Sequence, residues 1–170
     1  MTAVDRLYLA EAVPSLIVWG GIDPIVTAAD IIGSAQTIVS RNTNIAKLPA
    51  VVSFGSVHGG IRYNIIPDSV ELVGTIRTFD EGMRAAIHAD LENVAQHVAA
   101  AHGATAEAQV PDRQGNPVTV NDPDLTRRML PSLQAAAGSA NVIEPPLQMG
   151  AEDFAYYARE VPSMFFFVGA

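Results

Sequence analysis

Short runs of apolar and β-branched residues predict a series of strands in the first two thirds of the chain. Residues 16–19 (LIVW), residues 50–57 and the alternating segment IPDSVELVGTIRTF each have the composition of a strand. A turn-like HGG stretch separates the second run from the third. Residues Ala104 to Val110 then alternate small apolar residues with Thr105, Glu107 and Gln109, which predicts a half-buried or edge strand.

Two segments between these strands have helical patterns. Asp23-Pro24 is typical of an N-cap followed by proline at the first helical position, and the helix is expected to end near Ser40. From Asp80 to His102 a second, long amphipathic helix is predicted, closed by Gly103, with an apolar stripe of Met83, Ile87, Leu91, Val94, Val98 and Ala101. The order over residues 16–110 is therefore βαββαβ, the ferredoxin-like pattern.

A turn-rich stretch, PDRQGNP, runs from Pro111 to Pro117 and predicts a domain boundary. Beyond it, Asp122-Pro123 predicts a helix through Leu125, Met129 and Leu133; GAEDFAYYARE predicts a short helix, and SMFFFVG a buried strand. One strand cannot form a sheet by itself. We therefore expect an α+β chain, with one domain over residues 1–111 and a fragment of a larger α/β layer over residues 112–170.

Composition narrows the classes of partner. The chain has 170 residues, enough for one domain with a core or for one domain and a piece of another. Its net charge is -8, and the absence of a Lys/Arg cluster argues against nucleic acid or an anionic membrane as partner. There is no cysteine, which excludes thiolate metal sites. We find no signal peptide and no membrane span, so a cytoplasmic location is expected.

The low charged fraction, 16% against roughly 25% in typical soluble domains, suggests surface buried against something else. Among polar residues, His88, His97 and His102 have positions typical of a solvated helix face or a helix end. His58 is different, because a polar residue in a glycine-rich loop is more often functional. Arg77 could present its guanidinium to a carboxylate, and Asn64 stands before a predicted strand. By pattern alone, the favoured interpretations are a solvated or ion-paired strand arginine and a turn asparagine.

Glu152 and Asp153 follow a glycine in MGAEDFAYY and allow three interpretations. Neighbouring carboxylates can ligate a metal, share a proton in acid/base chemistry, or favour the positive end of a helix dipole. The simplest is the acidic first turn of a short helix that ends near Glu160. No GxSxG, P-loop, HExxH or GxGxxG motif occurs, which removes the common nucleophile, nucleotide and zincin sites.

Four motifs together resemble a known family. In order they are GIDPIVTAADIIGSAQTIVSRN, GSVHGGIRYNIIPDSVELVGTIRTFD, NPVTVNDPDLTRRML and MGAEDFAYYAREVPSMFFFVG, from about Gly21 to Gly169. They are similar to the metal-dependent amidohydrolases related to aminoacylase and carboxypeptidase G, above all to the branch acting on N-acyl amino acids, such as hippurate and indoleacetyl-amino-acid hydrolases. The resemblance implies an α/β catalytic domain with two metals, zinc, manganese or cobalt, and a ferredoxin-like lid that forms a homodimer.

The resemblance also implies roles for five residues. Asn64 of YNIIP and Arg77 of GTIRT match lid positions that reach substrate, the asparagine typically across the dimer, and His58 matches the HGG loop. Glu152 and Asp153 match a segment that lines the substrate pocket without binding metal.

The family's metal ligands and general-base glutamate match no part of this sequence, because they belong mostly to a region before the lid and to a histidine after the FFFxG strand. In place of the lid's glycine-rich, histidine-containing motif stands YLAEAVPSLIVWGG, which has no histidine. We therefore expect a partial amidohydrolase for small N-acyl amino acids, with no catalytic metal site in this chain. The alternative is a non-catalytic dimerisation or binding module derived from the lid.

Overall fold

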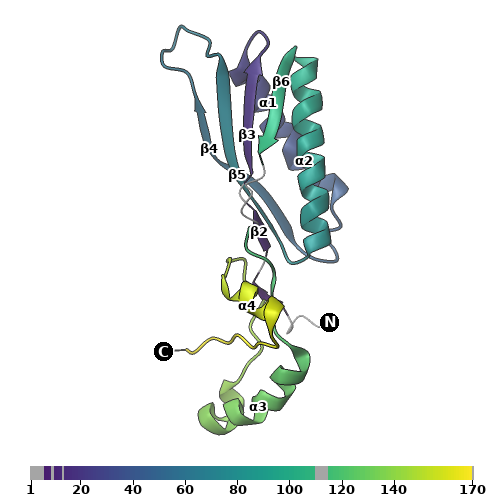
Figure 1. Ribbon diagram of the computed structural model, residues 1–170, viewed down its shortest axis with the longest axis vertical. Helices are drawn as coiled ribbons and strands as arrows, with labels where there is room; N and C mark the ends of the chain where they lie inside the picture. The colour runs from purple at the N-terminus through teal and green to yellow at the C-terminus, as the bar shows by residue number, and fades with distance from the viewer. Residues whose placement is uncertain (1–5, 9, 13, 110–114, 170) are drawn as a thin grey trace. The chain divides into compact units, whose positions relative to one another are not determined.

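The computed structural model describes residues 6–8, 10–12, 14–109 and 115–169 (Figure 1). The chain divides into two compact units, one of residues 11–115 and the other of residues 1–10 with 116–170. No helix among the described residues is long and apolar enough to cross a membrane. Each unit has its own secondary structure.

The first of these units, residues 11–115, is an antiparallel sheet with two helices. Its elements follow the order β3 (Ser15–Gly20), α1 (Pro24–Thr37), β4 (Ala50–Gly59), β5 (Ser69–Thr78), α2 (Glu81–Ala101) and β6 (Ala104–Gln109). A short π-helical turn, Ile38–Asn42, extends α1. The strands lie in the order β4-β5-β3-β6, and the short β2 (Ala10–Ala12) also pairs with β5. The chain therefore forms a mixed helix-and-strand unit in the element order that the hydrophobic pattern predicts.

Helix boundaries in this unit follow from local chemistry. Asp23 accepts hydrogen bonds from the backbone N–H of Ile25 at 2.9 Å and of Val26 at 3.2 Å, so it caps α1 as predicted. Asp80 caps α2 in the same way through the N–H of Met83 at 2.8 Å. Gly103 ends α2 with a φ of 66°, a left-handed conformation that favours glycine.

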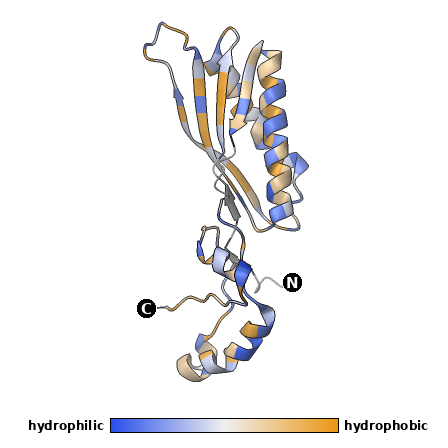
Figure 2. Cartoon of the chain, viewed as in Figure 1, coloured by the Kyte–Doolittle hydropathy of each residue, from blue (hydrophilic) through white to orange (hydrophobic). Residues whose placement is uncertain are grey.

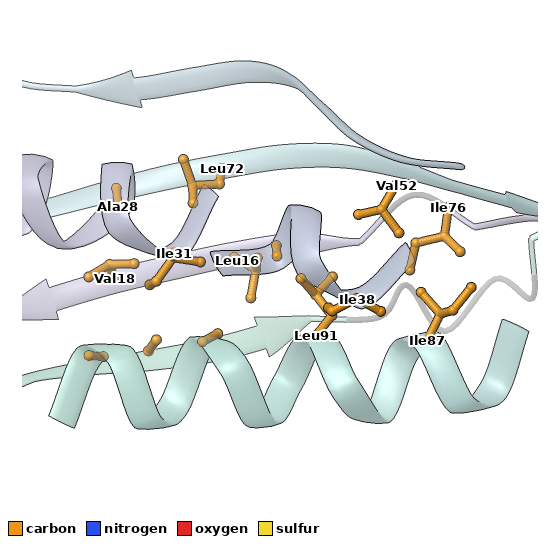
Figure 3. Packing of buried hydrophobic residues seen from close by; sticks show 14 of the residues in the cluster. Leu16, Val18, Ala28, Ile31, Ile38, Val52, Leu72, Ile76, Ile87 and Leu91 are labelled. Carbon is orange, nitrogen blue, oxygen red and sulfur yellow. The ribbon is translucent and has the colours of Figure 1, made fainter. Parts of the chain in front are cut away.

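Both helices cover one face of the sheet, and the hydrophobic core lies between this face and the helices (Figure 3). Leu16 and Val18 of β3 and Leu72 and Ile76 of β5 point to this face because side chains of a strand alternate. The helices contribute Ala28, Ile31, Ala35, Ile87, Leu91, Ala95 and Ala99. The α2 stripe thus continues through Ala95 and Ala99, whereas Ala101, which the sequence pattern included, is exposed. Among the described residues of this unit, no helix covers the other face of the sheet.

The second unit has little regular structure. Strand β1 (Arg6–Tyr8) pairs with β7 (Thr119–Val120), followed by α3 (Pro123–Ala137), a 3-10 turn (Ser139–Asn141) and α4 (Phe154–Glu160). The pairing of β1 with β7 was not predicted. Asp122 caps α3 as expected, accepting from the N–H of Leu125 at 2.7 Å. Although α3 is amphipathic, none of its residues is buried.

The predicted buried strand SMFFFVG is wrong. Residues 161–169 contain no strand, and Phe166, Phe167 and Val168 are 51%, 49% and 83% exposed. The segment after α4 is nevertheless hydrophobic along its length (Figure 2). The segment forms no strand because no neighbouring strand among the described residues pairs with its backbone N–H and C=O groups.

Candidate functional site

His58 lies in a strand, and its prediction as a loop residue is wrong. β4 continues to Gly59, and His58 pairs across the sheet with Glu71 of β5. Its Nε2 lies 2.6 Å from the Oγ of Ser56, two residues earlier on the same face. Antiparallel pairing carries the strand further than the Gly-Gly sequence indicates, because glycine is acceptable at a strand end.

Asn64 lies in the exposed loop of residues 60–68 that joins β4 to β5, several residues before β5 begins at Ser69. The loop lines two surface cavities. One, of about 640 Å³, is lined by Asn64, Asp23, Ile25 and residues 59–63, 65 and 66. The other, of about 680 Å³, includes His58 and Glu71 with the same central loop residues. His58 and Asn64 are therefore brought to the same end of the β4–β5 hairpin.

Arg77 lies at the other end of β5, on the sheet face that the helices leave open. It pairs with Val51, whereas Glu71 pairs with His58. At about 3.3–3.4 Å per residue, the six steps from Glu71 to Arg77 amount to roughly 20 Å. A small amino-acid derivative cannot bridge this distance. Arg77 and the His58–Asn64 end of one chain consequently cannot contact the same small ligand.

Glu152 and Asp153 precede helix α4, so their prediction as its first turn is wrong. The helix begins at Phe154, and Asp153 in the N-cap position makes no side-chain capping bond. A carboxylate oxygen of Glu152 accepts a hydrogen bond of 3.4 Å from the N–H of Phe154. Glu152 is half-buried and Asp153 is exposed. These acids belong to the second unit, whereas His58, Asn64 and Arg77 belong to the first.

His88 departs from the solvated helix face that the sequence pattern predicts. It is half-buried on α2, and its Nε2 is buried without a hydrogen-bond partner. Burial, and secondarily the positive charge of Arg84 one turn away, lower the pKa of His88 below its usual value. The neutral imidazole is therefore favoured in the folded chain. The helical pattern missed this because Nε2 becomes covered only when α2 packs in the fold.

Three residues at the candidate site escaped the sequence analysis. Asp23 lines the first cavity, Glu71 lines the second, and Ser56 contacts His58. Ser56 could have been found from the two-residue spacing to His58, which places both on one face of a strand. Glu71 could not, because its place opposite His58 depends on strand register and on the β-bulge between Phe54 and Ser56.

The described residues do not fit a metal centre, since they contain no group of three or more His, Cys, Asp or Glu side chains that could hold a metal ion. A hydrolytic metal site needs several such ligands converging on one point. What the first unit offers instead is an open sheet face with a guanidinium at one end and a histidine, a glutamate and an asparagine-bearing loop at the other. This arrangement can bind and orient a ligand.

Comparison with known proteins adds to this geometry. The sequence profile of peptidase family M20/M25/M40 matches residues 5–170. A Bacillus subtilis protein named as an amidohydrolase, YhaA, is 38% identical over 148 residues, 87% of this chain and 37% of its own. The N-acetyl-L-cysteine deacetylase of Bacillus subtilis is 34% identical over 172 residues, 99% of this chain and 40% of its own. The chain thus spans about 40% of the length of these relatives.

A solved structure agrees with the sequence comparison. The YXEP protein of Bacillus subtilis, a dinuclear metal-binding peptidase of the M20 family, superposes on 93% of this chain with a TM-score of 0.71 and 30% identity. The superposition covers 40% of the YXEP chain. Sequence and fold therefore point to the same group of proteins as the four motifs do.

Proposed function

The chain belongs to peptidase family M20/M25/M40, and from this premise we propose that it is part of a metal-dependent amidohydrolase that cleaves the amide bond of small N-acyl amino acids. The unit of residues 11–115 would form a ferredoxin-like lid and dimerisation domain, and residues 116–170 the C-terminal part of the catalytic domain. The boundary expected from the sequence, residues 1–111 and 112–170, differs mainly in assigning β1 to the lid, whereas β1 pairs with β7. The strand order β4-β5-β3-β6 supports the lid assignment. It is the order of a ferredoxin-like sheet, in which α1 connects β3 to β4 and α2 connects β5 to β6. The relative that deacetylates an N-acetyl amino acid supports the substrate class.

The observation that carries this proposal is the distance of roughly 20 Å along β5 between Glu71, opposite His58, and Arg77. Arg77, a planar cation on the open sheet face, would hold the carboxylate of the substrate. Asn64 and His58 would approach the same substrate from a second copy of the chain and stabilise the negative charge that develops on the carbonyl oxygen. Glu152 and Asp153 would line the pocket. A homodimer is thereby part of the proposed function, since one chain alone cannot bring these residues together.

The free edge of β4 and the outer face of α1 are the surface proposed for the dimer. Among the described residues β4 pairs only with β5, and its Val51 and Val57 are exposed. The exposed positions of α1 carry one charge, Asp30, which is paired with His102 at 2.8 Å. A face with so few charges beside an unpaired strand edge suits a second copy. The same surface would serve a non-catalytic dimerisation module, which is the alternative function.

Zinc, manganese or cobalt would supply the chemical step in the whole family enzyme, through ligands outside the described residues. We propose no step through a metal for this chain, whose residues would bind and orient the substrate. A cytoplasmic location and the absence of nucleic-acid and membrane partners stay predictions.

Hydrolysis and binding assays with the 170-residue chain test the two parts of this proposal separately. With N-acetylcysteine or hippurate and added zinc, manganese or cobalt, we expect no hydrolysis. Hydrolysis that a chelator abolishes and zinc or manganese restores would contradict the proposed absence of a catalytic metal site.

Substrate binding can be followed by NMR titration with the same compounds. Arg77→Ala should weaken binding about tenfold or more, because a charged hydrogen bond to the carboxylate is lost. Arg41→Ala, a change at an exposed arginine outside the proposed site, is the control. Equal affinities of the two variants would remove Arg77 from the site.

Light scattering distinguishes the composite site from a site within one chain. A dimer whose thermal stability falls on dilution is expected. A monomer that retains substrate affinity would contradict the shared site, and a dimer that binds no N-acyl amino acid would favour the non-catalytic module.

A further inference from the structure

Asn121 joins two segments of the second unit through its side chain. It is 4% exposed. Its Nδ2 donates to the carbonyl oxygen of Phe165 at 3.0 Å, and the N–H of Phe165 donates to its Oδ1 at 2.7 Å. The next backbone N–H, that of Asp122, donates to the carbonyl oxygen of Ser163 at 2.8 Å. The carboxamide therefore replaces a neighbouring strand for Phe165, satisfying both of its backbone groups.

The ring of Phe165 carries this link to helix α4. It packs against the ring of Phe154, with centroids 5.2 Å apart and planes inclined by 54°. Phe154 is the first residue of α4 and directly follows Asp153. Asp153 makes no capping bond, and the bond from the N–H of Phe154 to Glu152 is long at 3.4 Å, so the start of this seven-residue helix has little local reinforcement. Its place depends on packing, chiefly of Phe154 and of the fully buried Ala155.

We propose that Asn121 is a positioning residue for the acidic turn Glu152–Asp153. It fixes the backbone of Phe165, Phe165 fixes Phe154, and Phe154 fixes the turn immediately before it. Every contact in this series lies among residues 121–165 of the second unit, so no other part of the molecule is needed. The inference rests on the proposed function, in which the two acids line the substrate pocket.

Three variants of the 170-residue chain test the link. Asn121→Leu keeps the side-chain volume and removes both hydrogen bonds. Asn121→Asp keeps the acceptor for the N–H of Phe165 but replaces the donor with an oxygen facing its carbonyl. The control is Asn141→Leu, because the Nδ2 of Asn141 makes one exposed bond, of 2.7 Å, to the carbonyl oxygen of Ala137.

Amide NMR spectra and hydrogen exchange give the readout. In Asn121→Leu we expect exchange at the Phe165 N–H to rise about tenfold or more, and the amide signals of Glu152, Asp153 and Phe154 to shift. Asn121→Asp should shift the same signals with a smaller rise in exchange. Asn141→Leu should leave them in place. The amide signals of helix α3 should move little in either Asn121 variant. This result would distinguish a shift of the Glu152–Asp153 turn from a loss of structure throughout the second unit.

The inference is overturned if Phe165 loses protection while the Glu152 and Asp153 signals stay in place. If Asn121→Leu does not fold, Asn121→Asp decides by the same criterion. Failure of the proposed function gives a different result. In that case Glu152→Gln and Asp153→Asn would leave N-acyl amino acid binding unchanged, although the Asn121 variants still shift the turn.

Discussion

Residues 14–109 and residues 115–169 each contain a well-capped helix, but only the helix of the first region has buried residues. Helix α2 begins at a capping aspartate, Asp80, and buries Ile87, Leu91, Ala95 and Ala99 against a sheet. Helix α3 begins at an equally good cap, Asp122, yet buries none of its residues. The difference lies in the sheet, because α2 packs on several long strands, whereas β7 in the second region has two residues and pairs with the short β1. Capping and amphipathic pattern specify a helix, whereas burial requires a second layer.

The largest effect is expected when one leucine in each region is replaced by alanine. Leu72 is fully buried, whereas Leu130 of α3 is 38% exposed. Leu72→Ala should lower the free energy of unfolding by about 2–5 kcal/mol, through lost apolar burial and a cavity. Leu130→Ala should change it by less than about 1 kcal/mol. Urea denaturation followed by fluorescence of the single tryptophan, Trp19 in β3, measures the first region directly. Equal losses would mean that α3 is covered in solution.

A smaller effect is expected from removing the two helix caps. Asp80→Ala should destabilise the first region by about 1 kcal/mol, because the N–H of Met83 loses its acceptor. Asp122→Ala should leave the Trp19 transition unchanged and reduce the helical signal of α3, measured by amide chemical shifts. A Trp19 transition that moves equally in both variants would show that the two regions unfold as one cooperative unit.

The smallest effect concerns pH and His88 in the first region. Burial lowers the pKa of His88 in the folded chain, so the unfolded chain binds the proton more readily. The stability that depends on neutral His88 is fully present above the pKa of His88 in the unfolded chain, about 6.5. It is lost as the pH falls through the lower pKa of His88 in the folded chain. His88→Gln should therefore flatten the decline of the Trp19 unfolding midpoint below pH 6.5. An unchanged pH profile would assign the decline to other groups.

Prediction from the sequence succeeded where local signals decide. The caps Asp23 and Asp122, the start of α2 near Asp80, its glycine end and the element order from β3 to β6 follow from spacing and residue type. The prediction failed for SMFFFVG, because a run of phenylalanines indicates burial without indicating whether a partner strand is present. It failed also for the turn Glu152–Asp153, since the helix starts where Phe154 packs and not where the acids suit the dipole.

Candidate chemistry divides in the same way. Asn64, Arg77 and His58 could be named from motifs, but their grouping could not. Strand register places His58 opposite Glu71 and near the Asn64 loop, and it places Arg77 at the far end of β5. The pairing partner of a strand residue depends on segments far along the chain and on a bulge, which a single sequence does not specify. The distance that favours a shared site is a consequence of that register.

By itself the sequence determined the helical segments, most of the strands, the starting points of three helices and the family motifs. Only the tertiary structure decided which faces are buried, that His88 favours its neutral form, and that Asn121 takes the place of a strand beside Phe165. The physical reason is range. Capping and periodicity act within a few residues, whereas burial, register and the pairing of a buried carboxamide depend on groups brought together from distant parts of the chain.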